Sequence, residues 1–472
     1  MNMRKKLLGV EHPSTLRSIG NLAATYRDQG KLDEAEQLEV QVVDVSKKLL
    51  GAEHPDTLAS MANLAATYHN QDRLNEAEEL EVQVMNIRKK LLGAEHPSTL
   101  ASMGNLGRTY HKQGRLNKAE QLEVQVMNMR KKLLGVEHPS TLSSLANLAA
   151  TYHKQGRLNK AEQLEVQVMD MRKKLLGVEH PSTLSSMRNL AATYHNQGRL
   201  HKAEQLEVQV MDMRKKLHGA EHPSTLRSMG NLAAIYRDQG KLNKAEQLEV
   251  QVVDVSKKLL GAEHPDTLTS MANLAATYRN QERLNEAEQL EVQVMQIRKR
   301  LLGTEHPSTL TSMGNLGRTY HKQGKLDKAE QLEVQVMKMR KKLLGAEHPS
   351  TLSSMGNLGR TYYKQGMLNK AEQLEVQVMD MRKKLIGEEH PSTLTSMANL
   401  AATYHSQGRL NEAEQLEVQV MNMRKKLHGA EHPDTLTSME NVAKIYHKQG
   451  RLNEADQLKV HIMNIKKRIG CE

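Results

Sequence analysis

The 472-residue sequence contains no phenylalanine and no tryptophan, and it has a single cysteine, Cys471. A globular core of this size normally uses large aromatic side chains, whereas thin layers between stacked units can be filled by Leu, Val, Ala and Met. One cysteine excludes an intramolecular disulfide. The sequence shows neither a secretory signal in its first nine residues nor an apolar run near 18 residues. These absences indicate a soluble, cytosolic protein.

Proline is confined to one step of a strict repeat. All eleven prolines, from Pro13 to Pro433, follow Glu-His and stand 42 residues apart, and a glycine closes each unit with the same spacing, from Gly51 to Gly429. Such a period is typical of stacked arrays in which each unit buries its apolar face on its neighbours. A uniform array offers the same surface repeatedly, which disfavours a local catalytic site. We therefore expect no enzyme.

The first half of the unit predicts a helix of about 15 residues. Pro13 suits the first helical position, and Ser14, replaced by Asp56 in the next unit, is the expected cap or first-turn residue. Gly30 ends the helix because glycine accepts a positive φ. Asp72 and Glu282 take this glycine's place in two units, where the turn should be strained. The expected apolar stripe contains Leu16, Ile19, Leu22, Ala23 and Tyr26.

The second half predicts a helix of about 18 residues, from Asp33 to Leu50, that ends at Gly51. Tight turns on both sides make the two helices antiparallel, and no strand pattern competes, so we expect an all-α fold. The residues expected to face inward are Ala35, Leu38, Val42, Val45 and Leu49.

These residues resemble the tetratricopeptide repeat family, whose signature matches Leu22-Ala23-x-x-Tyr26 and Ala35. The 42-residue form with Leu-Gly-x-Glu-His-Pro is similar to kinesin light chain repeats, and residues 161–187 look like the C-terminal arrays of fungal nucleotide-binding, oligomerising receptors. The resemblance implies a right-handed superhelical solenoid of antiparallel helix pairs. Leu32 and Glu39 depart from the family pattern, which often has aromatic residues there.

The predicted organisation is a single repeat array over residues 1–472. Residues 1–10 form an incomplete opening helix, residues 11–430 form ten repeats, and residues 431–472 form a divergent, more polar capping repeat. Residues 35–58 are identical to residues 245–268, so a block of five units has been copied.

The resemblance also implies that the first helix of each unit lines a concave groove. One slot of that helix is asparagine in every unit, although asparagine costs roughly 0.7 kcal/mol against alanine within a helix. An amide ladder can hold an extended peptide backbone, as the resemblance implies, or it can bond to the neighbouring unit; both interpretations stay open. The candidate peptide-binding asparagines are Asn21, Asn63, Asn105, Asn147, Asn189, Asn231, Asn273, Asn315, Asn357, Asn399 and Asn441.

Arginines stand beside that ladder at Arg108, Arg188, Arg318 and Arg360, among mostly small side chains. A groove with guanidinium groups and few acids favours an acidic peptide, against the alternative of solvated charges without a ligand. The expected function is therefore protein or peptide binding, as the recognition arm of a larger cytoplasmic receptor or adaptor.

The composition and the repeat leave two other functions open. The array could instead be a spacer or an oligomerisation scaffold that self-associates through the incomplete first unit. Its pI of about 9.4 and its helical repeat also invite comparison with RNA-binding repeats. These are less favoured, because RNA-binding repeats vary the residues that face the bases, whereas the groove residues here are nearly the same in every unit. Histidine spacing does not fit a metal site and no phosphate-binding loop motif is present, so no metal, cofactor or membrane partner is expected.

Overall fold

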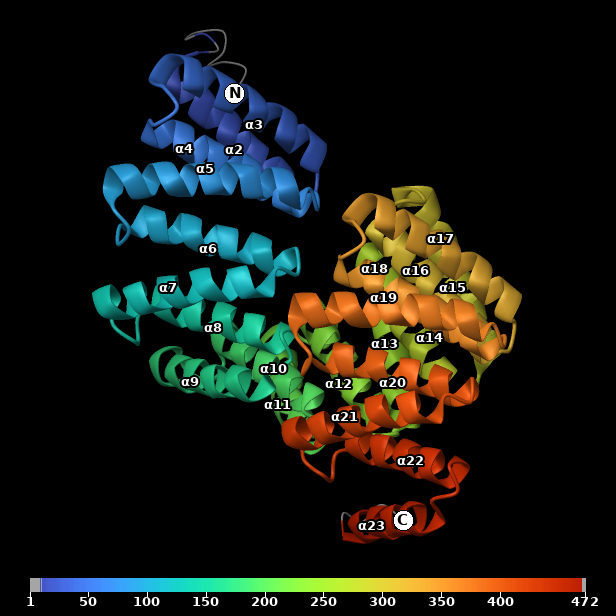
Figure 1. The fold of residues 1–472 in the computed structure, drawn as a ribbon. Coiled ribbons are helices and arrows are strands. Elements are labelled where there is room, and N and C mark those ends of the chain that lie inside the picture. The colour runs from blue at the N-terminus through green and yellow to red at the C-terminus, as the bar shows by residue number, and fades with distance from the viewer. Residues whose placement is uncertain (1–8, 10, 469–472) are drawn as a thin grey trace. The chain divides into compact units, whose positions relative to one another are not determined.

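The computed structural model describes Gly9 and residues 11–468, and within this part the chain is an all-α array of 22 helices (Figure 1). The predicted opening helix over residues 1–10 lies almost entirely outside the described residues. The A helices are α2 (Pro13–Asp28), α4 (Pro55–Asn70), α6 (Pro97–Lys112), α8 (Pro139–Lys154), α10 (Pro181–Asn196), α12 (Pro223–Asp238), α14 (Pro265–Asn280), α16 (Pro307–Lys322), α18 (Pro349–Lys364), α20 (Pro391–Ser406) and α22 (Pro433–Lys448). The B helices are α3 (Leu32–Leu50), α5 (Leu74–Leu92), α7 (Leu116–Leu134), α9 (Leu158–Leu176), α11 (Leu200–His218), α13 (Leu242–Leu260), α15 (Leu284–Leu302), α17 (Leu326–Leu344), α19 (Leu368–Ile386), α21 (Leu410–His428) and α23 (Leu452–Arg468).

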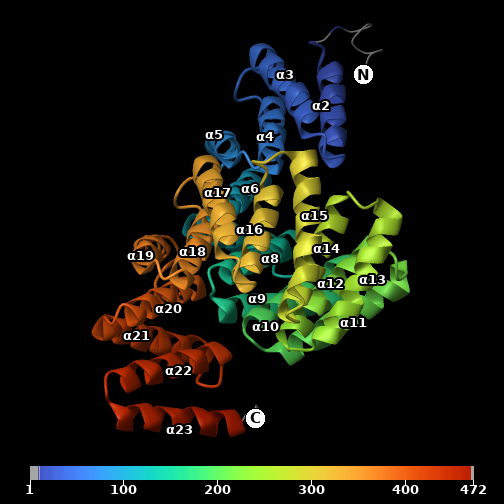
Figure 2. The same ribbon diagram turned by 90° about the vertical axis from the view of Figure 1, so that its right-hand side faces the viewer.

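The chain divides into two compact units, residues 1–154 with α2–α8 and residues 155–472 with α9–α23. Within each unit every helix packs on the helices before and after it, and consecutive A helices also touch, as α2 and α4 or α12 and α14 do. The stacked layers of α20–α23 are clearest in Figure 2. That all 472 residues form one array stays a prediction.

Each A helix begins with a histidine cap followed by proline. The Nδ1 atom of His180 accepts a hydrogen bond from the backbone N–H of Ser182 at 3.1 Å, with Pro181 at the first helical position. The imidazole satisfies one of the amides that a helix start leaves unpaired. The sequence predicts Ser14, or Asp56 in the next unit, as the cap or as a first-turn residue. Both lie in the first turn, and the cap is the histidine two residues earlier.

The turns between A and B helices need a positive φ, as predicted. Gly30 has φ 76°, and where glycine is replaced Asp72 and Glu282 both adopt φ 61°. L-residues in this region cost about 1–2 kcal/mol. These two turns are therefore strained relative to the others.

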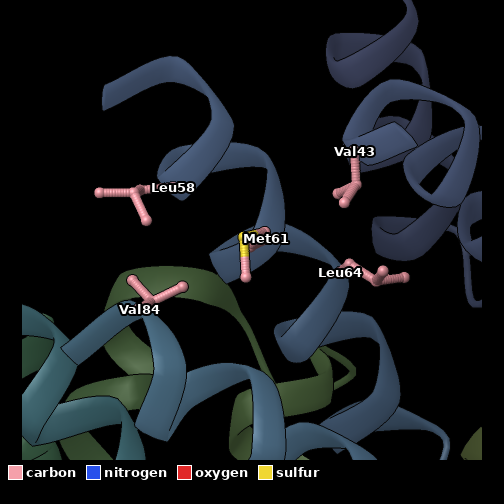
Figure 3. Close-up of a cluster of buried hydrophobic side chains, with 5 residues drawn as sticks. All are labelled: Val43, Leu58, Met61, Leu64 and Val84. Carbon is pink, nitrogen blue, oxygen red and sulfur yellow. The ribbon is translucent and has the colours of Figure 1, made fainter. Parts of the chain in front are cut away.

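The core consists of thin layers between helices. Val43 of α3 and Val84 of α5 lie on either side of α4, which contributes Leu58, Met61 and Leu64 (Figure 3). Met61 is fully buried. Burying such a side chain contributes about 1.5–3 kcal/mol, so Leu, Met and Val hold the layers together without large aromatic residues.

The last turn of most B helices is exposed, contrary to the prediction for Leu49. Ala35 and Val42 are buried as expected, but Leu49 is 47% exposed. Its equivalents as far as Leu343 are exposed as well, whereas Leu385 and Leu427 are half-buried. The B helix α3 has 19 residues and its neighbours α2 and α4 have 16, so its end extends about 4 Å beyond them.

Candidate functional site

The predicted groove residues lie along the A helices and border two hollows in residues 155–472. The first hollow, of about 280 Å³, is bounded by α12, α13 and α14, and its lining includes Asn231 and Asn273. The second, of about 170 Å³, is bounded by α14, α16, α17 and α18, and its lining includes Arg318, Asn357 and Arg360. The structure thus brings two of the four predicted arginines together.

None of the eleven asparagines is buried. Asn21, Asn63 and Asn273 are exposed, and the other eight are half-buried. Within the described residues, six side-chain amides form no hydrogen bond with the protein and are free to meet a ligand: Asn21, Asn63, Asn147, Asn189, Asn273 and Asn399.

The other asparagines have partners of two kinds. The Oδ1 atoms of Asn105 and Asn357 accept hydrogen bonds from Arg108 and Arg360, each at 2.6 Å, and Asn315 accepts one from Arg318. These bonds lie within one helix and hold the arginine side chain along the A helix face.

Asn231 and Asn441 bond to the preceding unit instead. Their Nδ2 atoms donate to buried carboxylates, Asn231 to Glu207 at 3.2 Å and Asn441 to Glu417 at 3.3 Å. The asparagine slot therefore serves inter-repeat bonding in some units and leaves an open amide in others.

The second hollow is strongly basic. Besides Arg318 and Arg360 it is lined by Arg279, His321 and Lys322, with Glu333 as its only acidic residue. The pKa of Arg318 is lowered, first by loss of water around its guanidinium and then by repulsion from Arg279 and Arg360. Mutual repulsion between close cations favours the binding of an anion among them.

Neutralising partners reduce this charge only in part. Arg279 donates to Glu291 at 2.7 Å, and Lys322 pairs with Glu282 at 2.6 Å. Burial raises the pKa of Glu333 to about 7, so this carboxyl is half protonated near neutral pH. The sequence analysis did not single out Arg279. It could have done so, because most units have histidine at this position and this unit has arginine.

The remaining two predicted arginines lie elsewhere. Arg108 is exposed on α6, in residues 1–154, and Arg188 is half-buried on α10. The charge of Arg188 acts on buried groups of α11, where it lowers the pKa of Glu207 against the larger, opposite effect of burial. Arg188 is not part of the lining of the second hollow.

The lysines at the ends of the A helices are structural. Lys112 donates to the main-chain carbonyl of His69 at 2.7 Å, and Lys448 donates to that of His405 at 3.0 Å. Each lysine caps the C-terminus of the preceding A helix, where carbonyl groups lack helical partners. These lysines are therefore already engaged with the protein.

A buried glutamate ladder is the feature that sequence reasoning noted at Glu39 but did not explain. The same slot is glutamate in ten units, and every one is at most 7% exposed. Glu375, for example, accepts a bond from Thr403 of the next unit at 2.7 Å, and burial raises its pKa to about 7. The family's aromatic residue is thus replaced by a carboxyl. It bonds to the next repeat at Glu207, Glu333, Glu375 and Glu417, and to an arginine of its own unit at Glu39, Glu249 and Glu291.

In the part of the chain that the structure describes, no helix is long and apolar enough to cross a membrane. Residues 9 and 11–468 also contain no group of three or more His, Cys, Asp or Glu side chains arranged to hold a metal ion.

The fold and its repeating A helix face define a helical repeat protein. Family profiles described as tetratricopeptide repeats match residues 21–90, 166–216 and 183–258, and a second such profile matches residues 99–140, 141–182, 267–308, 309–350, 351–392, 393–434 and 435–468. These matches cover most of the chain. The protein belongs to the tetratricopeptide repeat family.

Among solved structures, the chain is similar to a kinesin light chain of Podospora anserina described as having nearly identical tetratricopeptide-like repeats. The identity is 41% over 44% of this chain and 99% of that one, with a TM-score of 0.40. BtubC of P. vanneervenii is 19% identical over 50% of this chain and 94% of that chain, with a TM-score of 0.40. A Rap protein solved in complex with competence and sporulation factor is 11% identical over 79% of this chain and 98% of that chain, with a TM-score of 0.52. A search of curated proteins found no match.

Proposed function

We propose that the protein is a non-catalytic interaction module whose A helix face binds an extended, acidic peptide segment of a partner protein. The main observation in support of this proposal is the basic hollow, in which Arg279, Arg318 and Arg360 come from three successive A helices. Paired guanidinium groups are well suited to carboxylates because each offers a planar fork of donors.

The open asparagine amides support the same proposal. Asn189 and Asn399 are half-buried, and neither side chain bonds to the protein within residues 11–468. An amide can donate to a peptide carbonyl and accept from a peptide N–H, so a row of them can bind a main chain with little dependence on sequence. The module would serve as the recognition arm of a larger cytoplasmic receptor or adaptor, of the kind that the fungal repeat arrays suggest.

The arginine part of the proposal is tested by fluorescence polarisation with an acidic peptide of Asp, Glu and Gly residues and its Lys-substituted counterpart. We expect the acidic peptide to bind more tightly, with an affinity that falls as salt increases. The double change Arg318→Ala and Arg360→Ala should weaken it at least tenfold. Equal binding of both peptides, or no effect of the double change, would contradict the proposal.

The asparagine part has a matched control in the chain. Changing Asn189 and Asn399 to alanine should weaken the peptide without lowering the melting temperature. Changing Asn231 and Asn441 should lower the melting temperature, because Glu207 and Glu417 then lose a buried hydrogen bond. Loss of stability in the first pair, with affinity unchanged, would assign the ladder to inter-repeat bonding alone.

A further inference from the structure

An arginine of the B helix, buried or half-buried where it is present, is missing from two of the ten B helices that precede another A helix. In eight units this slot is arginine, whose NH1 donates to a main-chain carbonyl and a serine hydroxyl of the next A helix; Arg214, for example, donates to the Ser224 carbonyl at 3.1 Å and to the Ser228 Oγ at 2.8 Å. The eight arginines are Arg88, Arg130, Arg172, Arg214, Arg298, Arg340, Arg382 and Arg424. The two exceptions are Ser46 and Ser256.

The presence of serine in place of arginine at Ser256 leaves the hollow beside α13 open. Ser256 lies in the lining of the 280 Å³ space, together with Asp266 and Ser270, which are the counterparts of the acceptors in the other units. In all eight arginine units the acceptor serine is at most 4% exposed, whereas Ser270 and the equivalent Ser60 are half-exposed. Loss of the arginine therefore uncovers its former acceptors.

The uncovered acceptors carry an added negative charge. The residue that supplies the carbonyl is serine in seven of the arginine units, but after both exceptions it is aspartate, Asp56 and Asp266. Each exception thus lacks the arginine and has a carboxylate on the residue whose carbonyl the arginine would contact. The Asp266 side chain is 68% exposed, and its carboxylate lies 3.9 Å from His264 Nδ1. Uncovered hydrogen-bond acceptors and an added carboxylate together favour the binding of a cationic group that has several hydrogen-bond donors and belongs to a bound partner, which is called the guest below.

The rest of the lining fits a long aliphatic stem with a charged head. Leu226, Val252 and Leu259 give apolar walls, and the Arg237 guanidinium is neutralised by Glu249 at 3.0 Å. Arginine has such a side chain, with an aliphatic stem that packs on apolar surface and a charged head that stays among polar groups.

Arg227 is the remaining charged residue of the lining, and it is exposed. Burial lowers the pKa of Arg214, and the charges of Arg188 and Arg227 lower it further, so Arg227 also acts towards α11. It would disfavour a second basic residue in the guest and would pair with an acidic neighbour. This agrees with a guest segment that is acidic apart from one arginine.

We propose that the hollow at Ser256 is a subsite for one arginine side chain of the bound partner segment, whose guanidinium takes the place of the arginine that the other units supply themselves. The subsite rests on the proposed peptide-binding function. Helix α14 lines both hollows, because it contributes Asp266 and Ser270 to the first and Arg279 to the second. A segment with an arginine and acidic residues can therefore contact both.

The test uses the full chain and an acidic peptide with one central arginine, compared with analogues that carry citrulline, lysine or glutamate there. Citrulline keeps the shape of arginine and removes its charge. We expect the arginine peptide to bind at least tenfold more tightly than the citrulline peptide. Equal binding of the two, or tighter binding of the glutamate peptide, overturns the subsite.

Filling the hollow provides the matched variant. Ser256→Arg, together with Ser46→Arg, restores the arrangement of the other units; the pair Arg424 and Asp434 shows that arginine is compatible with the following aspartate, since Arg424 donates to the Asp434 carbonyl at 3.2 Å. The double variant should melt no lower than the wild type and should bind the arginine and citrulline peptides alike. If the double variant still binds the arginine peptide more tightly than the citrulline peptide, the proposal is contradicted.

A probe without the acidic segment separates the two proposals. Saturation-transfer NMR with N-acetylarginine methylamide should show contact with the wild type and none with the double variant, and the citrulline counterpart should give no signal. Contact without binding of any acidic peptide would contradict the proposed function and keep the subsite. If the acidic peptides bind without arginine selectivity and this probe gives no signal, the subsite is contradicted and the proposed function is kept.

Discussion

Replacing Glu375 by glutamine should stabilise the array at alkaline pH and leave it almost unchanged at acidic pH. Glu375 is 3% exposed, and burial raises its pKa to about 7 from an ordinary value of 4.5, against smaller opposite effects of Thr403 and Arg360. A difference of about 2.5 pKa units corresponds to about 3 kcal/mol between the protonated and ionised states.

The sign follows from proton binding. Between pH 4.5 and pH 7 the native state holds a proton on Glu375 that the unfolded state has lost, so stability falls as pH rises through this window and is constant above it. Glutamine keeps the bond with Thr403 and does not ionise. The gain from Glu375→Gln should therefore grow from near zero at pH 4.5 to about 3 kcal/mol at pH 8, an upper figure because the surroundings can relax.

Hydrogen–deuterium exchange of peptides from α19 and α20, corrected for the intrinsic pH dependence of exchange, is the appropriate assay because arrays open locally. Protection at pH 8 should rise by about 100-fold in the variant. Glu39→Gln is the control: Glu39 is equally buried but accepts a bond from Arg27 at 3.1 Å, so its gain should be smaller at each pH. Unchanged or lower protection of Glu375→Gln at pH 8 would refute the reasoning.

Three further changes test the fold. Glu282→Gly puts glycine at a φ of 61° that disfavours glutamate, and it should raise stability by about 1 kcal/mol in urea unfolding. The lost pair with Lys322 is exposed and contributes little, and no gain would contradict the assigned strain. His180→Ala removes the cap of α10 and should cost about 1 kcal/mol, with exchange increased at that helix start while His180→Asn retains protection. Met61→Ala empties a fully buried site between α3 and α5 and should cost about 2–5 kcal/mol, seen as a lower melting temperature.

The helix pairs could be predicted from sequence because their boundaries depend on local chemistry. Proline at the first helical position and glycine with positive φ act through the backbone alone, so Pro13 and Gly30 mark the ends of α2 without knowledge of its neighbours. The exposure of Leu49 could not be predicted in this way. Its helical spacing puts it in line with Val42, and only the shorter partner helices leave it uncovered.

The site was predicted in part for the same reason. The asparagine and arginine slots stand out in the sequence, but whether Asn231 bonds to Glu207 or Asn189 stays open depends on contacts about 24 residues apart. Likewise Arg318 and Arg360 could be placed on one face, whereas the contribution of Arg279 depends on how α14 lies beside α16.

Near-identity of the units makes single exchanges interpretable. Ser256 in place of arginine is visible in the sequence, yet its meaning is not, because nothing local shows that the arginine normally covers a serine of the next helix. The same unit carries Arg227 on the A helix where its neighbours carry a small residue, so this unit has a guanidinium on the open face and none in the B-helix slot. The uniform slots, such as the buried glutamates, belong to stacking between repeats. The pair Arg227 and Ser256, which recurs as Arg17 and Ser46, alters the open face while the stack is kept, and this makes these segments of an otherwise repetitive groove chemically distinct.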